Sequence, residues 1–151
     1  MAAQAIKQTL LALNYMHEKD IIHRDIKPEN ILVVPEEKSK GQLINVKLTD
    51  FGFACYFDPN EGLTTFCGSP FYMAPEITRK ETYGKPVDIW AVGVLAYNLI
   101  TGDYPFYYDG DEKEVLFDMI QNKEPDFAGL RDELNPLSVQ FVEKCLKKDP
   151  A

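Results

Sequence analysis

The chain has 151 residues, of which 45% are hydrophobic, 12% aromatic and 26% charged. This composition predicts one folded domain with a core and argues against wholesale disorder. The 24 acidic and 16 basic side chains give a net charge of −8, which disfavours binding to nucleic acid or to a membrane, because both require clustered Lys and Arg. Residues 103–133 alone carry ten acids and three bases. That stretch is either a solvated face or an acidic platform for a basic partner.

Apolar side chains recur at helical spacing near the start of the chain and predict an amphipathic helix: Ile6, Leu10, Leu13 and Met16. The polar cluster HRDIKPEN at 23–30 precedes a β-prone run at 31–34, and a second alternating run covers 46–49. Pro35 and Gly41 mark a loop between the two runs. We therefore expect two short paired strands with the polar cluster just before the first.

Residues 50–76 show no sustained periodicity and predict a long loop, and long loops inside compact domains are usually functional. Residues 87–100 are apolar on nearly every side, which predicts a buried central helix. Another amphipathic helix is predicted by four later residues: Val115, Leu116, Met119 and Ile120.

Near the end of the chain, Ser138 reads as the N-cap of a last helix that runs through Leu146. Leu137 and Val142 flank this serine in the pattern of a hydrophobic staple.

The three cysteines, Cys55, Cys67 and Cys145, are widely spaced and form no CxxC pair. Structural zinc is therefore not expected, and a reducing intracellular (cytoplasmic) compartment fits best. The first residues do not read as a signal peptide, and the longest central apolar run, at 89–97, is too short to span a bilayer.

Four polar residues have the right types and spacing for a phosphate or metal site. Asp25, Lys27 and Asn30 lie in one short irregular stretch, and Asp50 directly follows the second predicted strand. If the strands pair, Asn30 and Asp50 converge on one cation, and their oxygen ligands suit Mg²⁺ bridging to phosphates. A base, a charge clamp and a metal together predict phosphoryl transfer. Taken singly, each residue also fits a cap or a turn.

Four motifs occur in order along the chain: HRDIKPEN at 23–30, DFG at 50–52, APE at 74–76 and DIWAVG at 88–93. In this order and spacing they resemble the C-terminal lobe of a eukaryotic protein kinase. The resemblance covers essentially all 151 residues and is closest to the calcium/calmodulin-dependent kinase group. It implies a mainly α fold, the helical C-terminal lobe of the kinase fold with a short β-hairpin at the active site. It also implies a Ser/Thr protein kinase that uses ATP and Mg²⁺.

The resemblance assigns roles to individual residues. Asp25 would accept the proton of the substrate hydroxyl, Lys27 would neutralise charge on the transferred phosphoryl group, and Asn30 would complete the catalytic set. Asn30 and Asp50 would hold the Mg²⁺ ions, and Leu32 would lie beneath the adenine. The implied cofactor-binding residues are thus Lys27, Glu29, Asn30, Leu32 and Asp50.

Lys27 and Ser69 resemble their counterparts in Ser/Thr kinases rather than tyrosine kinases, and Ser69 is expected to hydrogen-bond near Asp25 and Lys27 and to help position the substrate. Glu29 resembles the acid that contacts an Arg upstream of the target residue. Its usual acidic helper appears here as Asn98, so only a modest preference for basic peptides is implied. The expected partners are protein substrates with Ser or Thr and a regulatory protein, with neither nucleic acid nor a membrane.

Regulation is implied by Thr65, which aligns with the usual activation-loop phosphorylation site, with Thr64 as the alternative. A phosphate there would add about −1.5 to −2 charge and could pair with Arg24. At the position of Cys55 many relatives have a Lys that also binds this phosphate. Its absence weakens the expected regulation by phosphorylation. Both threonines also fit the role of ordinary loop residues.

The resemblance further implies internal contacts of the HRD stretch. Asp88 in the buried helix would bond to the backbone of that stretch and fix its conformation. His23 would be a packed histidine whose ring stacks with Phe51.

Some kinase elements do not occur in the sequence. There is no GxGxxG before a strand, no strand Lys of the VAIK type and no helix Glu to pair with it, and the Arg that normally pairs with Glu76 would follow Ala151. We therefore expect 1–151 to be a partial kinase domain without the N-terminal lobe and the end of the C-terminal lobe, with little activity alone. One alternative is a non-catalytic binding module or decoy. Another is a small-molecule phosphotransferase, although that class lacks the APE and DxWxxG elements.

Overall fold

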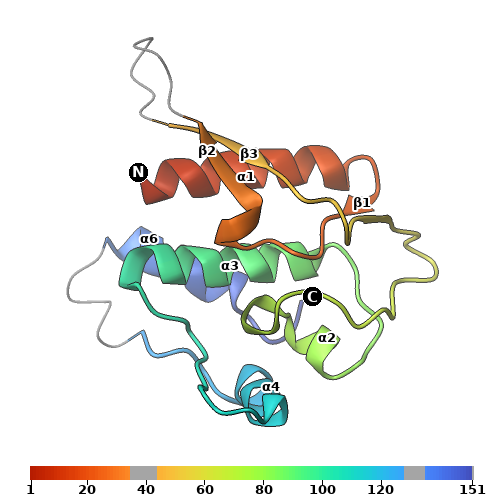
Figure 1. Ribbon diagram of the computed structural model, residues 1–151, viewed down its shortest axis with the longest axis vertical. Helices are drawn as coiled ribbons and strands as arrows, with labels where there is room; N and C mark the ends of the chain where they lie inside the picture. The colour runs from red at the N-terminus through yellow and green to blue at the C-terminus, as the bar shows by residue number, and fades with distance from the viewer. Residues whose placement is uncertain (35–43, 128–134, 151) are drawn as a thin grey trace.

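The computed structural model of the chain describes residues 1–34, 44–127 and 135–150. Two helices of 16 residues, α1 (Ala2–His17) and α3 (Pro86–Thr101), lie side by side, and α6 (Pro136–Cys145) packs against α3 (Figure 1). The remaining helices, α2 (Pro75–Thr78) and α4 (Lys113–Asn122), contact each other beside this layer. The described part of the chain is therefore mainly helical, as the sequence predicts.

Two antiparallel strand pairs join the helices. β2 (Ile31–Val34) pairs with β3 (Asn45–Leu48), so the predicted hairpin strands are confirmed, although the second begins one residue earlier and ends one residue earlier than expected. β1 (Ile21–Ile22) pairs with β4 (Cys55–Tyr56), which the sequence did not predict. The loop predicted from Pro35 and Gly41 lies outside the described residues, as do residues 128–134 of the acidic stretch.

The central helix predicted from its apolar composition is confirmed as α3, which is buried along most of its length. Gly93 permits the close approach of α6, because a Cβ on Gly93 would lie 2.6 Å from the Cβ of Cys145 and 2.9 Å from Leu146 Cδ2. Gly102 ends the helix with φ 80°, the left-handed conformation that glycine adopts without a steric penalty.

The two predicted amphipathic helices around the core, at the start of the chain and after α3, are confirmed. α1 buries Ile6, Leu13 and Met16, and α4 buries Leu116 and Ile120. Of the described helices, none is both long and apolar enough to cross a membrane.

The start of α6 differs from the prediction of a Ser138 N-cap and a hydrophobic staple. Asn135 is the N-cap, and its side chain accepts a hydrogen bond from Leu137 N at 2.9 Å. Pro136 occupies the first helical position, which its fixed φ and missing N–H favour, so Ser138 lies inside the helix. Leu137 is 71% exposed and forms no staple. The helix ends at Cys145, with Leu146 as its C-cap.

The segment predicted as a long loop, residues 50–76, is mostly irregular but holds β4 and the short 3₁₀ helix η2 (Pro70–Tyr72). Two contacts hold the middle of this segment in place. Leu63 forms an antiparallel β-bridge with Tyr83, and Phe66 packs edge to face on Phe117 of α4, with ring centroids 5.9 Å apart. The segment therefore follows a defined path over α4 and the region before α3.

Candidate active site

The loop that follows β1 is shaped by a carboxylate from α3. His23 N donates to Asp88 Oδ2 at 2.9 Å, and Arg24 N donates to Asp88 Oδ1 at 2.8 Å. Arg24 has φ 70°, a left-handed conformation that is uncommon for a residue with a side chain, and these bonds support it. The expected contact of Asp88 with the backbone of the HRD stretch is confirmed.

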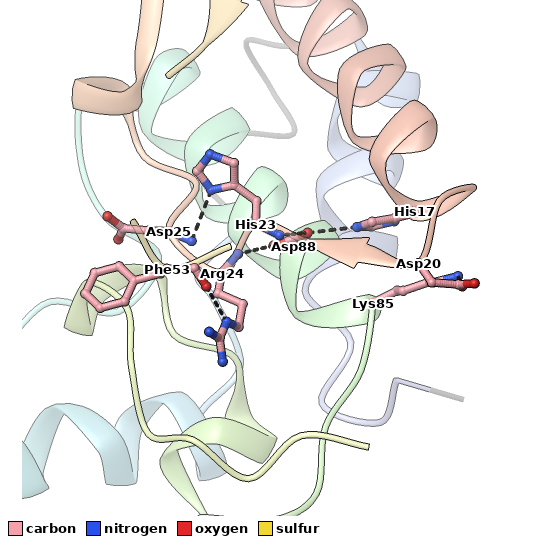
Figure 2. A network of polar contacts seen from close by, with 8 residues as sticks. All are labelled: His17, Asp20, His23, Arg24, Asp25, Phe53, Lys85 and Asp88. Atoms are coloured by element: carbon pink, nitrogen blue, oxygen red, sulfur yellow. Dashed lines mark hydrogen bonds and ion pairs between the residues drawn. The ribbon is translucent and has the colours of Figure 1, made fainter. Parts of the chain in front are cut away.

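Figure 2 shows that Asp88 has a third partner, the ring of His17 at the end of α1. His17 Nε2 lies 2.8 Å from Asp88 Oδ2, and the Asp88 side chain is fully buried. The sequence analysis did not find this contact, although His17 directly follows the buried Met16 on the apolar face of α1. The carboxylate therefore ties the end of α1, the HRD stretch and α3 together.

His23 is a packed histidine, as expected, with its residue fully buried. Its Nδ1 accepts a hydrogen bond from Asp25 N at 3.3 Å, so the proton lies on Nε2, which donates to Thr49 O at 3.3 Å. The ring contacts Phe51 with centroids 5.3 Å apart, but the planes are tilted by 56° rather than stacked in parallel.

Asp25 lies at the centre of a closed set of hydrogen bonds. Lys27 Nζ lies 2.9 Å from Asp25 Oδ2 and donates to Ser69 Oγ at 2.8 Å, and Ser69 Oγ in turn donates to Asp25 Oδ1 at 2.9 Å. Asn30 Nδ2 donates to Asp25 Oδ2 at 2.9 Å and to Asp25 O at 2.8 Å. The four residues, which are separated by up to 44 positions in the sequence, thus converge on one buried carboxylate.

These contacts decide the charge of the Asp25 carboxyl. Burial by itself would raise its pKa, but the hydrogen bonds from Lys27, Ser69 and Asn30 and the charge of Lys27 outweigh burial and hold the pKa below its usual range. Asp25 is therefore an anion at neutral pH, and it retains the lone pairs that a proton acceptor requires.

Asn30 and Asp50 are brought close by the strand pair, because Thr49 N donates to Asn30 O at 2.9 Å. Both side-chain hydrogen bonds that Asn30 forms with described residues use Nδ2, so its amide oxygen can serve a cation. Asp50 is exposed and accepts from Gly52 N through Oδ1 at 3.1 Å. No cluster of three or more His, Cys, Asp or Glu in the described ranges could hold a metal alone. One carboxylate and one amide oxygen fit Mg²⁺, which takes its other ligands from phosphates and water.

Two predicted site residues lie outside this set of hydrogen bonds. Glu29 is exposed in the 3₁₀ helix η1 (Pro28–Asn30), and Leu32 is 53% exposed on β2. An exposed Leu beside the polar cluster offers an apolar surface to a flat ring.

The predicted regulatory residues are connected through a tyrosine that the sequence analysis missed. Arg24 Nη1 donates to the hydroxyl of Tyr83 at 3.2 Å, and that hydroxyl donates to Thr65 O at 2.7 Å. Arg24 Nε also donates to Phe53 O at 2.6 Å. Thr64 and Thr65 are both exposed. The guanidinium therefore lies near the segment that carries the two threonines.

The surroundings of Arg24 keep its guanidinium charged. Burial lowers the pKa of Arg24, but the Tyr83 hydroxyl outweighs burial and raises it, so the guanidinium stays charged. Burial raises the pKa of Cys55 although the charge of Arg24 lowers it. A neutral thiol at position 55 adds no second cation beside Arg24.

Glu76 of α2 is buried, with 6% of its surface exposed. Burial raises the pKa of its carboxyl, and no ion pair to it is formed by the residues described in the structure. The charge of Arg79 lowers this pKa but does not outweigh burial. A buried carboxylate that forms no ion pair is costly.

The protein kinase domain family matches residues 1–151, and the chain belongs to that family. It is 36% identical to the calcium/calmodulin-dependent protein kinase type I of Schizosaccharomyces pombe over 156 residues, which cover 99% of this chain and 44% of that protein. It is 38% identical to the calcium/calmodulin-dependent protein kinase type 1 of Macrobrachium nipponense over 150 residues, 98% of this chain and 41% of the relative.

A further relative is the serine/threonine-protein kinase DCLK1 of Rattus norvegicus, with 48% identity over 116 residues, 77% of this chain and 26% of that protein. The chain therefore spans less than half the length of each of these curated relatives. Members of the family use ATP and Mg²⁺, and the donor set of Asn30 and Asp50 fits that metal.

Proposed function

We propose that the protein containing this chain is an ATP-dependent Ser/Thr protein kinase. The chain itself, 1–151, is a partial kinase domain, the C-terminal lobe with its catalytic hairpin. The observation that carries this proposal is the closed set of hydrogen bonds around the buried Asp25 carboxylate. The relatives named above, all of them protein kinases, support it.

The proposed roles follow from the atoms that remain available. Asp25 is an anion and receives the proton of the Ser or Thr hydroxyl. Lys27 contacts both Asp25 and Ser69, so its charge lies where a phosphoryl group and its acceptor would meet. Asn30 and Asp50 hold Mg²⁺. When bound there, ATP would supply the phosphoryl group and Mg²⁺ would neutralise the charge on its oxygens.

Substrate positioning and regulation complete the proposal. Ser69 fixes the segment that follows it against Asp25, and Leu32 and Glu29 border the site on the side of the hairpin and η1. A phosphate on Thr65, or alternatively Thr64, would lie near the Arg24 guanidinium. Glu29 gives a modest preference for basic substrates, and the protein acts in an intracellular compartment.

The experiment uses the longer protein that contains this chain, with Mg·ATP and a library of Ser/Thr peptides. We expect phosphorylation by the wild type and a loss of about 10²-fold or more in kcat for Asp25→Asn, because general-base assistance is worth roughly 10²–10⁴-fold. Asp118→Asn, an equal loss of charge on the exposed face of α4, serves as the control. Full activity of Asp25→Asn would overturn the proposal, and a wild type that binds partners without phosphorylating any peptide would indicate a non-catalytic module.

A further inference from the structure

Three aromatic rings form an exposed surface that the proposed chemistry does not use. Phe71 lies 4.7 Å from Tyr104 and 5.9 Å from Tyr107 between ring centroids, and Tyr104 lies 6.5 Å from Tyr107. The planes are nearly parallel, with interplanar angles of 23°, 14° and 9°. Tyr107 is 58% exposed, and the other two rings are partly exposed. We call these three residues the aromatic platform.

The aromatic platform adjoins the candidate active site. Phe71 belongs to η2 and follows Ser69 by two residues, and the Ser69 hydroxyl donates to Asp25 at 2.9 Å. The buried Tyr72 meets Tyr104 edge to face, with ring centroids 5.8 Å apart, and so packs the platform against the core. Phe71 therefore places the platform beside the segment that Ser69 holds against Asp25.

The connection that carries Tyr104 and Tyr107 is acidic. The eleven residues that connect α3 to α4, 102–112, include four exposed acids and no basic side chain: Asp103, Asp109, Asp111 and Glu112. Glu29 lies near the buried Tyr72, which contacts Tyr104 of the platform. Burial raises the pKa of Tyr72, and the Tyr104 hydroxyl and the charge of Glu29 raise it further. An aromatic surface on an acidic connection is complementary to a cation.

We propose that the aromatic platform binds an arginine side chain of the protein substrate, and so makes Arg a specificity element distinct from a general preference for positive charge. This inference rests on the proposed kinase function. Ring faces attract cations through their quadrupole. A guanidinium is planar, is weakly hydrated and stacks on aromatic rings, whereas the Lys ammonium is a compact and strongly hydrated point charge. The platform therefore separates Arg from Lys, which the surrounding acids alone would not do.

The test compares three peptides that differ only in Arg, Lys or Ala at one position, scanned through the residues next to the target Ser. The wild-type protein should show a KM for the Arg peptide about 3–5-fold lower than for the Lys peptide, the magnitude of an exposed cation–π contact. Tyr107→Leu keeps an apolar side chain but removes the ring face, so the ratio of the two KM values should fall toward one. Tyr107→Phe retains the ring and should retain the ratio. Tyr56→Leu, at an 80% exposed tyrosine of β4, should leave the ratio unchanged.

The outcomes separate the two proposals. Equal KM values for Arg and Lys peptides in the wild type, or a ratio that survives Tyr107→Leu, would overturn the role of the platform. A preference for Leu or Phe peptides, or a change of oligomeric mass in Tyr107→Leu, would assign the surface to an apolar side chain or to a second copy and would overturn it equally. If the wild type phosphorylates no peptide, the kinase proposal fails. The anisotropy of a fluorescent Arg peptide titrated with wild type and Tyr107→Leu then still decides whether the platform binds arginine.

Discussion

The buried Asp88 carboxylate offers a direct test of how the HRD stretch is held. It accepts three hydrogen bonds, from His17 Nε2, His23 N and Arg24 N, at 2.8, 2.9 and 2.8 Å. In Asp88→Asn one oxygen becomes an NH₂ group of nearly the same size, so at least one of these donors faces another donor. Because the site is buried, that donor cannot turn to water.

Leaving one buried donor unsatisfied costs about 1–3 kcal/mol. With a urea slope of about 1–3 kcal/mol per M for a small protein, the midpoint of unfolding should fall by about 1 M. Trp90 reports the transition, since it is the single tryptophan of the chain, is buried and lies on the same helix as Asp88. Asp118→Asn removes the same charge from an exposed position and should shift stability by no more than about 0.5 kcal/mol. If both variants shift the midpoint equally, Asp88 does not hold the loop as described.

Three further changes probe other parts of the fold. Gly93→Ala should destabilise the chain by about 1–3 kcal/mol, because the new methyl would lie 2.6 Å from the Cβ of Cys145; thermal unfolding checks this, and an unchanged Tm would contradict the close packing of α3 and α6. Asn135→Ala should cost about 1 kcal/mol through loss of the cap to Leu137 N, whereas Ser138→Ala should cost less in the same urea titration. Burial lowers the pKa of Lys148 to about 8 from an ordinary 10.5, so the folded chain releases this proton before the unfolded chain does. Stability should therefore rise between pH 8 and 9.5, and Lys148→Met should flatten that rise in urea titrations across the range; an equal slope would refute the assignment.

Elements with a sustained pattern could be predicted from the sequence. α3 is apolar on nearly all sides and was predicted with bounds within one residue of those observed. The four apolar residues that predicted a later amphipathic helix all lie within α4. The start of α6 could not be found in this way, because Asn135 and Ser138 are both common N-caps and only the geometry at Pro136 decides between them. β1 and β4 have two residues each, too few for any periodicity.

In the candidate active site too, residues that belong to a sequence motif could be predicted and residues outside the motifs could not. The order of the motifs predicted that Ser69 lies near Asp25 and Lys27, because the spacing of these motifs is characteristic of one family. His17 and Tyr83 were missed since their partners lie 71 and 59 residues away in the sequence. Nothing local distinguishes a His at a helix end or a Tyr in a loop from an ordinary surface residue.

The amide of Asn30 has a consequence for the base beside it. Its Nδ2 lies 2.9 Å from Asp25 Oδ2, so an aspartate at position 30 would bring two carboxylates within hydrogen-bond distance. Two such groups cannot both ionise readily, and one pKa rises strongly. The pair would then share a proton, and Asp25 would lose part of its basicity. The amide of Asn30 instead donates a hydrogen bond to Asp25 and leaves its oxygen for a cation. Asp25 can therefore accept a proton at the same pH at which Asn30 holds a metal ion.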